Sequence, residues 1–410
     1  MSSSIAETAS LSDGPAAPSG LRSAIGIFVM IGAVLFNMLL LTAITPVLST
    51  AAKYFGTGSD AQIIAQMIIT MTAIGIMIGG PLAGWLAERL TLRTVLILAL
   101  ALYGTAGASG LFLESATGLL AARFLQGLSA GGIAISSYSM IAERFQGSAR
   151  PRMLGYQSAL TAAAGFVTGL GAGQLAEAEG WRAPFGLYLL AFGMIALALV
   201  AQGIPVGRRH AEVRTSDDSG PKGSLWSIWH LYLMLIPLYA AAFMFYLQLS
   251  FLLAGDGIGS PALQSKIMAA ITATNFIAGL VYGRVLERLR PRRMFCLILA
   301  VMAASDIVVG IGHGVVWMTV GCALAGFAGG GIVPFVTNLI TTRAPPALRS
   351  RGLGFMYSLV YVGQFANPFT VTPLRMAIGN HEAFLVVGGL LAAAALIQGL
   401  YPKSVAAGLA

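Results

Sequence analysis

Charge is what this sequence has least of. Only 10% of its 410 residues are Asp, Glu, Lys or Arg, whereas a soluble chain carries about 25%. Because the surface of a water-soluble domain needs such groups, the shortage excludes most soluble enzymes and makes lipid the expected solvent. There are only two cysteines, Cys296 and Cys322, and both lie in apolar stretches. The sequence therefore offers neither a disulfide framework nor a cysteine-ligated metal site.

Local catalytic and metal motifs are also missing. None of the four histidines has the spacing of H-E-x-x-H, and no lysine completes G-x-x-x-x-G-K-[ST], which argues against such a zinc site and against ATP-driven pumping by this chain alone. The segment from Gly127 through Ser129 to Gly131 spells G-x-S-x-G, but it lies inside a continuous apolar run rather than at a strand-to-helix turn. We therefore expect helix packing rather than a hydrolase, and predict no enzyme activity, cofactor or metal.

What the chain has in excess is apolar sequence: 57% of residues are hydrophobic and the mean hydropathy is +0.82. A membrane helix takes about 20 to 25 residues, so long apolar runs predict spans. Twelve such runs are present, at 24–50, 61–87, 94–113, 117–141, 154–175, 184–204, 229–252, 263–284, 294–312, 315–340, 354–377 and 383–402. The predicted fold is all-α and membrane-spanning, with twelve helices in two pseudo-symmetric six-helix bundles.

The positions of the few charged residues indicate how the chain is oriented in the membrane. If both termini are cytoplasmic, 19 of the 24 Lys and Arg residues fall on the cytoplasmic side. Four fall in outer loops, namely Lys53, Arg182, Lys266 and Arg375, and Arg123 lies within a span. This bias matches the positive-inside rule, so the net charge of +9 does not indicate nucleic acid binding. We predict a disordered cytoplasmic tail at 1–23, six-helix bundles at 24–204 and 229–402, a cytoplasmic linker at 205–228 and a cytoplasmic tail at 403–410.

The two halves repeat each other when the second is moved back by 199 positions. Glu88 and Arg93 then align with Glu287 and Arg292, and Gly127 aligns with Gly326, without a gap. Two parallel six-helix repeats are typical of transporters that carry their substrate between the halves near the bilayer midplane.

Three segments resemble motifs of the major facilitator superfamily. They are Gly84-Trp-Leu-Ala-Glu88-Arg89-Leu-Thr-Leu-Arg93, Arg123-Phe-Leu-Gln126-Gly127 and Gly180-Trp181-Arg182-Ala-Pro184-Phe185. Their order and spacing extend the resemblance over residues 24–402. In the first motif, Thr91 and Leu92 replace the usual glycine and first basic residue, which predicts a looser turn.

The resemblance implies that Glu88 latches the outward-open state across the two halves. An acid at the cytoplasmic end of a helix, near hydrocarbon and among arginines, also predicts an ion pair on physical grounds. The alternative is a solvated loop that carries charge only because of the positive-inside rule. The expected cytoplasmic gate consists of Glu88, Arg89, Arg93, Arg144, Glu287, Arg288, Arg292 and Arg343.

Inside the spans, polar residues predict a substrate cavity that is mostly neutral and aromatic. The candidates are Asn37, Gln66, Arg123, Ser137, Tyr239, Tyr246, Asn275, Asn338, Tyr357, Tyr361 and Gln364. Each of these could instead form an ordinary interhelical hydrogen bond, and Arg123 could snorkel to the outer interface. Asp306 is the one acid near the middle of a predicted span. Asp306 and Arg123 are therefore the candidates for proton coupling.

The fifth span carries glycines at positions 165, 169, 171 and 173. The run resembles the antiporter motif of the superfamily's drug:H⁺ exporters, except that Leu170 stands where that motif has proline; close helix packing would need the same glycines. The resemblance implies proton-coupled antiport and efflux of a small organic or drug-like solute by a monomer in the lipid bilayer of a bacterial-type inner membrane. Uptake or facilitated passage of a small metabolite, or a non-transporting receptor, remain alternatives.

Overall fold

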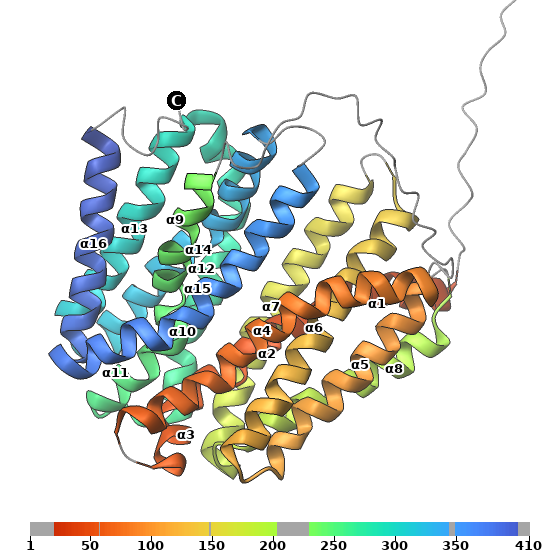
Figure 1. Ribbon diagram of the computed structural model, residues 1–410, viewed down its shortest axis with the longest axis horizontal. Coiled ribbons are helices and arrows are strands. Elements are labelled where there is room, and N and C mark those ends of the chain that lie inside the picture. The colour runs from red at the N-terminus through yellow and green to blue at the C-terminus, as the bar shows by residue number, and fades with distance from the viewer. Residues whose placement is uncertain (1–19, 57, 147–148, 203–228, 344–348, 401–410) are drawn as a thin grey trace, which may run out of the picture.

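The computed structural model describes residues 20–56, 58–146, 149–202, 229–343 and 349–400, and these residues are almost entirely helical. The predicted linker at 205–228 and the tail at 403–410 lie outside the described residues, as does nearly all of the N-terminal tail. Figure 1 shows two groups of helices side by side, one from each half of the chain.

The N-terminal half matches the first six predicted spans. Its first span is broken into pieces, and its sixth begins as a 3₁₀ helix. The elements are α1 (Leu21–Gly32), α2 (Leu35–Thr42), η1 (Thr45–Val47), α3 (Leu48–Phe55), α4 (Ser59–Arg89), α5 (Leu92–Ala108), η2 (Ser109–Leu111), α6 (Ala116–Arg144), α7 (Ala149–Glu179), η3 (Ala183–Leu189) and α8 (Leu190–Val200).

The C-terminal half supplies the other six spans, and its first span is again broken. The elements are α9 (Trp229–Ala242), α10 (Met244–Leu247), α11 (Leu249–Gly255), α12 (Pro261–Arg288), α13 (Pro291–Ile311), α14 (Val315–Arg343), α15 (Arg349–Ile378) and α16 (Asn380–Leu400). Among the described residues, nine helical segments are long and apolar enough to cross a membrane by themselves. The bent α9–α11 segment, which turns by 42°, makes a tenth.

Local sequence explains how the helices start and turn. Thr91 caps α5, because its Oγ1 accepts a hydrogen bond of 3.2 Å from the backbone N–H of Thr94. Ser115 caps α6 in the same way through Gly118, also at 3.2 Å. The α4–α5 connection was expected to be looser. It is instead a short turn, and Thr91, which replaces the usual glycine, caps the helix that follows.

Close helix packing repeats in the two halves. A Cβ on Gly127 of α6 would lie 2.1 Å from the carbonyl oxygen of Thr72 in α4. Its repeat partner Gly326 in α14 meets the carbonyl oxygen of Ile271 in α12 at the same distance. Only glycine permits such backbone contact. The glycines of the G-x-S-x-G segment thus serve packing in a continuous helix, as expected.

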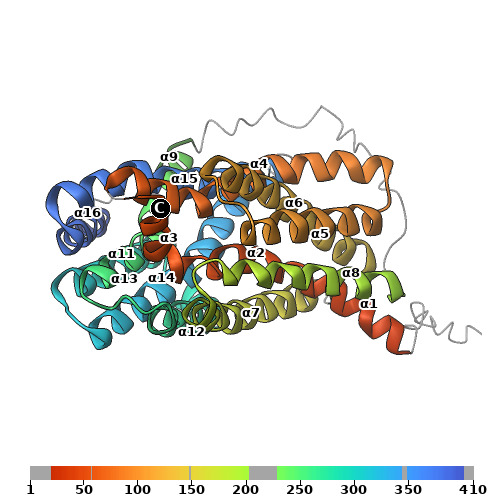
Figure 2. The same cartoon turned by 90° about the horizontal axis from the view of Figure 1, so that it is seen from below.

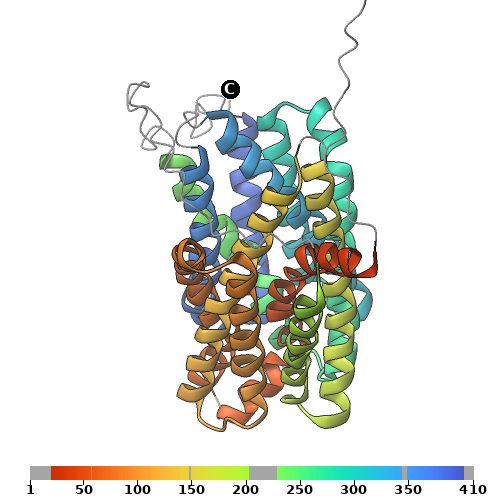
Figure 3. The ribbon, with the colours of Figure 1, turned by 90° about the vertical axis from the view of Figure 1, so that its right-hand side faces the viewer.

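The halves meet along two helix pairs. Figure 2 shows α4 beside α15 and α7 beside α12, and both pairs make extensive contact. The helices of both halves run broadly along one direction (Figure 3), which we take as the membrane normal. Any feature between the halves is therefore enclosed by these four helices and by the broken spans.

Candidate functional site

A buried polar cluster joins the halves at what the predicted topology makes their outer end. Gln66 of α4 and Gln248, at the break between α10 and α11, exchange two side-chain hydrogen bonds of 3.2 Å. Gln248 also donates to Asn367 at 2.8 Å and to Thr372 at 3.2 Å, both in α15. Thr372 donates to Gln66 at 2.9 Å. All four side chains are 0% exposed, so their polar groups bond to one another instead of to water.

Arg375 completes this cluster. It is 4% exposed, and it donates to Gln248 Oε1 at 3.1 Å, to Asn380 Oδ1 at 2.9 Å and to Gln62 Oε1 in the N-terminal half. Its guanidinium also lies over the Phe251 ring, 4.7 Å from the centroid. Arg375 was expected in an outer loop. The structure instead buries it in the last turn of α15, between the halves.

Two further contacts close the same end. The Ser250 hydroxyl of α11 donates a hydrogen bond to Ser49 Oγ of α3 at 3.1 Å. It also accepts a hydrogen bond of 3.2 Å from the backbone N–H of Ser49. Ser260 donates to the Glu177 carboxylate of α7 at 2.8 Å. These hydrogen bonds, like those of Gln62 and Gln66, cross from one half to the other at this end. We call the set of Ser49, Gln62, Gln66, Gln248, Ser250, Thr372 and Arg375 the outer seal.

The ends that are predicted to be cytoplasmic look different. Glu88 and Arg89 are exposed, Arg89 stacks on Trp85 of its own helix at 3.8 Å, and Glu88 forms no ion pair within the described part of the chain. Arg144 and Arg343 are half-buried, and the side chains of Glu287 and Arg288 lie outside what the structure describes. The latch through Glu88 is expected in an outward-open state, and it stays a prediction.

Arg93 and Arg292 have a shared role that the sequence did not reveal. Arg93 donates to the Leu199 carbonyl at 2.6 Å, and Arg292 donates to the Gln398 carbonyl at 2.7 Å. Both donors and both acceptors are related by the internal repeat. Each arginine therefore caps the carboxyl end of the last helix of its own half, where a cation is favoured, and does not reach across to the other half.

Arg123 is fully buried in the N-terminal half. It donates to the carbonyls of Ile68 (2.6 Å) and Leu40 (3.0 Å), and to the side chains of Gln126 (2.5 Å) and Tyr188 (2.9 Å). These bonds tie α6 to α2, α4 and η3. The snorkelling alternative is wrong, because the guanidinium is 0% exposed and its donors are held inside the bundle.

Asp306 lies in a cavity inside the C-terminal half. The cavity has a volume of about 90 Å³ and is lined by α9, α10, α12, α13 and α14. Three predicted cavity residues, Tyr239, Tyr246 and Asn275, line it together with Asp306. The Asp306 side chain is 1% exposed, and its Oδ1 atom has no hydrogen-bond partner among the described residues. The structure therefore brings a buried acid, two tyrosines and an amide to one place, with room for several water molecules.

The remaining predicted residues are spread over both halves. Ser137 donates to the Met30 carbonyl and accepts from Gln157 at 2.8 Å, so it links helices inside the first bundle. Asn37 Oδ1 is buried and unpaired within the described residues, whereas Asn338 and Tyr361 each have a partner. Gln364 is buried at 5% exposure, and the side chain of Tyr357 is outside the described set.

Five members of the outer seal (Ser49, Gln62, Gln248, Ser250 and Thr372) were not expected from the sequence, nor was Asn367, which accepts a hydrogen bond from Gln248. Gln248, Asn367 and Thr372 are polar residues in apolar spans, and Gln62 precedes Gln66 by one helical turn. The turn spacing of Gln62 and Gln66 was a visible signal. Their partners come from two distant segments, so the cluster itself could not be read from spacing.

A second cavity, of about 900 Å³, is a groove formed by α9, α13, α15 and α16. Thr370 and Gln398 are the only polar side chains among the residues that line it, if the indole of Trp229 is set aside. A groove of this composition suits hydrocarbon rather than a polar solute.

Two six-helix halves with matched packing, closed at one end by a polar seal, define a helical membrane protein built like a transporter. The sequence model of the Major Facilitator Superfamily matches residues 30–258 and 233–407, which together cover most of the chain. The chain belongs to the major facilitator superfamily. No curated protein sequence matches it.

Solved structures share the fold at low identity. The nucleoside transporter NupG has a TM-score of 0.74 at 13% identity, covering 92% of this chain and 100% of its own. The xylose transporter XylE from E. coli, in an inward open conformation, has a TM-score of 0.69 at 15% identity, covering 92% and 96%. A POT peptide transporter in complex with alafosfalin has a TM-score of 0.74 at 14% identity, covering 94% and 95%. The branch of exporters suggested by the sequence is not distinguished by these likenesses.

Proposed function

We propose that this protein is a proton-coupled secondary transporter that exports a small organic solute by alternating access. The observation that carries the proposal is the buried Asp306 carboxyl, which faces a small aromatic and polar cavity without a hydrogen-bond partner for Oδ1 among the described residues. Acids inside membrane spans are costly and commonly serve proton pathways.

The environment of Asp306 supports a proton-carrying role. An ionised carboxylate needs water, a cation or hydrogen-bond donors, and none of the residues that line its cavity is cationic. Asp306 is therefore stable in this conformation as the neutral acid. If the cavity gains water when the halves move, hydration stabilises the ionised carboxylate and the proton can leave. Proton release is thereby linked to the conformational cycle.

The outer seal supports alternating access. Polar groups of both halves replace water at the outer end, while Glu88 and Arg89 at the other end are exposed. Polar contacts of this kind can be exchanged for water at modest net cost, since each is worth about 0.5 to 1.5 kcal/mol. The seal can therefore open and close repeatedly, as an alternating mechanism requires.

The direction of transport is the finer part of the proposal. Export is favoured by the resemblance of the α7 glycines to the exporter motif. The same glycines also pack tightly: a Cβ on Gly165 would lie 2.5 Å from Met38 Cγ, and one on Gly173 would lie 2.1 Å from Ser265 Oγ. Uptake is the second candidate, because one structural neighbour at 15% identity is described as a D-xylose-proton symporter.

Liposome transport tests function and direction together. Solutes that raise the melting temperature of the purified protein are loaded on one side of proteoliposomes, with and without an imposed pH gradient. We expect movement of solute against the direction of proton flow. Movement with the protons would replace export by uptake. Ligand stabilisation without any flux would replace both by a receptor.

A further inference from the structure

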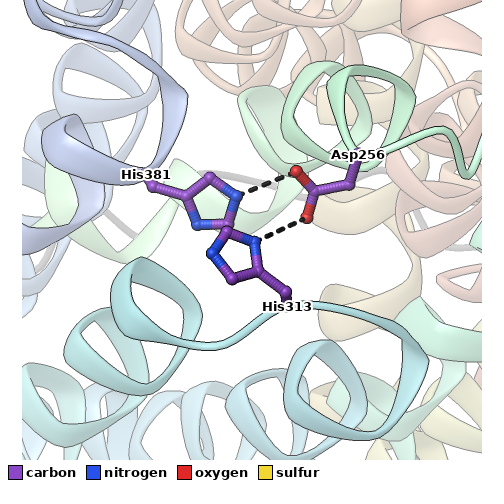
Figure 4. A group of neighbouring side chains, drawn as sticks. All are labelled: Asp256, His313 and His381. Carbon is purple, nitrogen blue, oxygen red and sulfur yellow. Dashed lines mark hydrogen bonds and ion pairs between the residues drawn. The ribbon is translucent and has the colours of Figure 1, made fainter.

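Three side chains from separate segments meet at the outer end of the C-terminal half. Asp256 follows α11, His313 lies between α13 and α14, and His381 is in the first turn of α16 (Figure 4). His381 Nε2 lies 2.9 Å from Asp256 Oδ1, and His313 Nδ1 lies 3.8 Å from Asp256 Oδ2. One ligand atom from each residue fits within a span of 4.8 Å.

The tautomer of His381 is set by its other nitrogen. Nδ1 lies 3.1 Å from the backbone carbonyl oxygen of Val309, which can only accept, so Nδ1 carries a proton. Nε2 of the neutral ring then presents a lone pair to the Asp256 carboxylate at 2.9 Å. Two lone pairs at that distance require a cation between them. A backbone carbonyl that orients the ring through its far nitrogen is also the usual support of a metal-bound histidine.

The cation could be a proton or a metal ion, and the second half of the cluster favours the metal. A proton shared by His381 and Asp256 would satisfy that pair alone. It would leave Asp256 Oδ2 buried without a hydrogen-bond partner among the described residues, facing His313 at 3.8 Å. An ion that binds both imidazoles and the carboxylate satisfies all three residues.

We propose that Asp256, His313 and His381 form a binding site for a divalent transition metal such as Zn²⁺. Two histidines and one carboxylate are a common zinc set, with water as the fourth ligand. Zinc bonds of about 2.0 to 2.1 Å place tetrahedral ligand atoms roughly 3.3 Å apart, between the two separations found here. His313 is 75% exposed, so its ring can move toward the ion.

Backbone turns bring the three ligands together. Gly257 (φ 82°) follows Asp256, Gly314 (φ 83°) follows His313, and Gly379 (φ 110°) comes two positions before His381. A bound ion would fasten the end of α11 to the α13–α14 connection and to α16. Because α11 begins directly after Gln248, the ion would also stiffen the segment that carries part of the outer seal.

Binding of Zn²⁺ to the full-length, tag-free protein tests the proposal. After treatment with a chelator, the protein in detergent is titrated with Zn²⁺ by calorimetry, and Co²⁺ is used as a visible probe of the ligand set. We expect one strong site per chain. H313A and D256N should each weaken it by about tenfold or more and change the Co²⁺ absorption, whereas D60N, which removes an exposed carboxyl at the outer end of α4, should not.

H313A carries the test if the other variants fold poorly, because His313 is largely exposed and has no hydrogen bond within the described residues. Its melting temperature without metal should match that of the unsubstituted protein. The proposal is overturned if no stoichiometric site is found, or if H313A binds Zn²⁺ and Co²⁺ as the unsubstituted protein does.

Discussion

Gln66 and Gln248, which belong to opposite halves of the chain, each donate a hydrogen bond of 3.2 Å to the other's side-chain oxygen. This reciprocal pair lies at the centre of the outer seal, with Thr372 and Arg375 bonded to the same two amides. The pair fixes the relative position of α4, α15 and the α10–α11 break in this conformation. It must separate if the two halves open toward the outside.

Cross-linking the outer seal should stop transport. The Oγ atoms of Ser49 and Ser250 are 3.1 Å apart, so cysteines at both positions are close enough for a disulfide. In a C296A/C322A background, we expect oxidised S49C/S250C to lose flux and to regain it on reduction. S49C alone, treated with the same oxidant, is the control. If the cross-linked protein transports as fast as the same protein after reduction of the disulfide, the outer end does not need to open.

Adding a methyl group at the repeated glycines should destabilise both halves. G127A and G326A each force a Cβ to within 2.1 Å of a backbone carbonyl oxygen, and such overpacking costs about 1 to 3 kcal/mol. G193A is the matched control, because a Cβ there meets nothing within 4 Å. Melting temperatures in one detergent measure the effect. Equal values for all three variants would contradict the packing described for α4–α6 and α12–α14.

Removing the guanidinium of Arg123 should loosen the N-terminal half. R123M strands the Leu40 and Ile68 carbonyls and the Gln126 side chain that now accept its hydrogen bonds. Each stranded buried group costs about 1 to 3 kcal/mol. We expect a large fall in melting temperature, and also a fall in R123K, because an ammonium cannot reach all four acceptors. R123K with unchanged stability would mean that charge alone matters at this position.

Substitutions of Arg93 should affect stability, whereas substitution of Glu88 should affect transport. R93A and R292A remove matched caps from the ends of α8 and α16, so each should lower the melting temperature by a similar small amount. E88K should keep its melting temperature, since Glu88 is exposed here, but should slow transport if it latches the outward-open state. Normal transport by E88K would eliminate the latch.

The elements that depend on composition could be predicted from sequence. Membrane helices follow from apolar length, and the repeat aligned Arg93 with Arg292 before their shared contact was known. The break at Gln248 was not predicted, because neither Gly nor Pro marks it. The Gln248 side chain bonds instead to partners in α4 and α15, which are distant in the sequence. Asp256, His313 and His381 come from three segments with no common spacing. Only the folded chain brings such residues together, so motif searches could not find them.

The role of Asp306 as carrier of the coupled proton is tested by solute flux through D306N in proteoliposomes under an imposed pH gradient. Because Asp306 Oδ1 lacks a hydrogen-bond partner in the described structure, the amide should fold normally, and its melting temperature checks this. We expect D306N still to exchange solute across the membrane but no longer to accumulate it in response to the pH gradient, while D60N behaves like the unsubstituted protein. Gradient-driven accumulation by D306N at the rate of the unsubstituted protein would show that Asp306 does not carry the coupled proton.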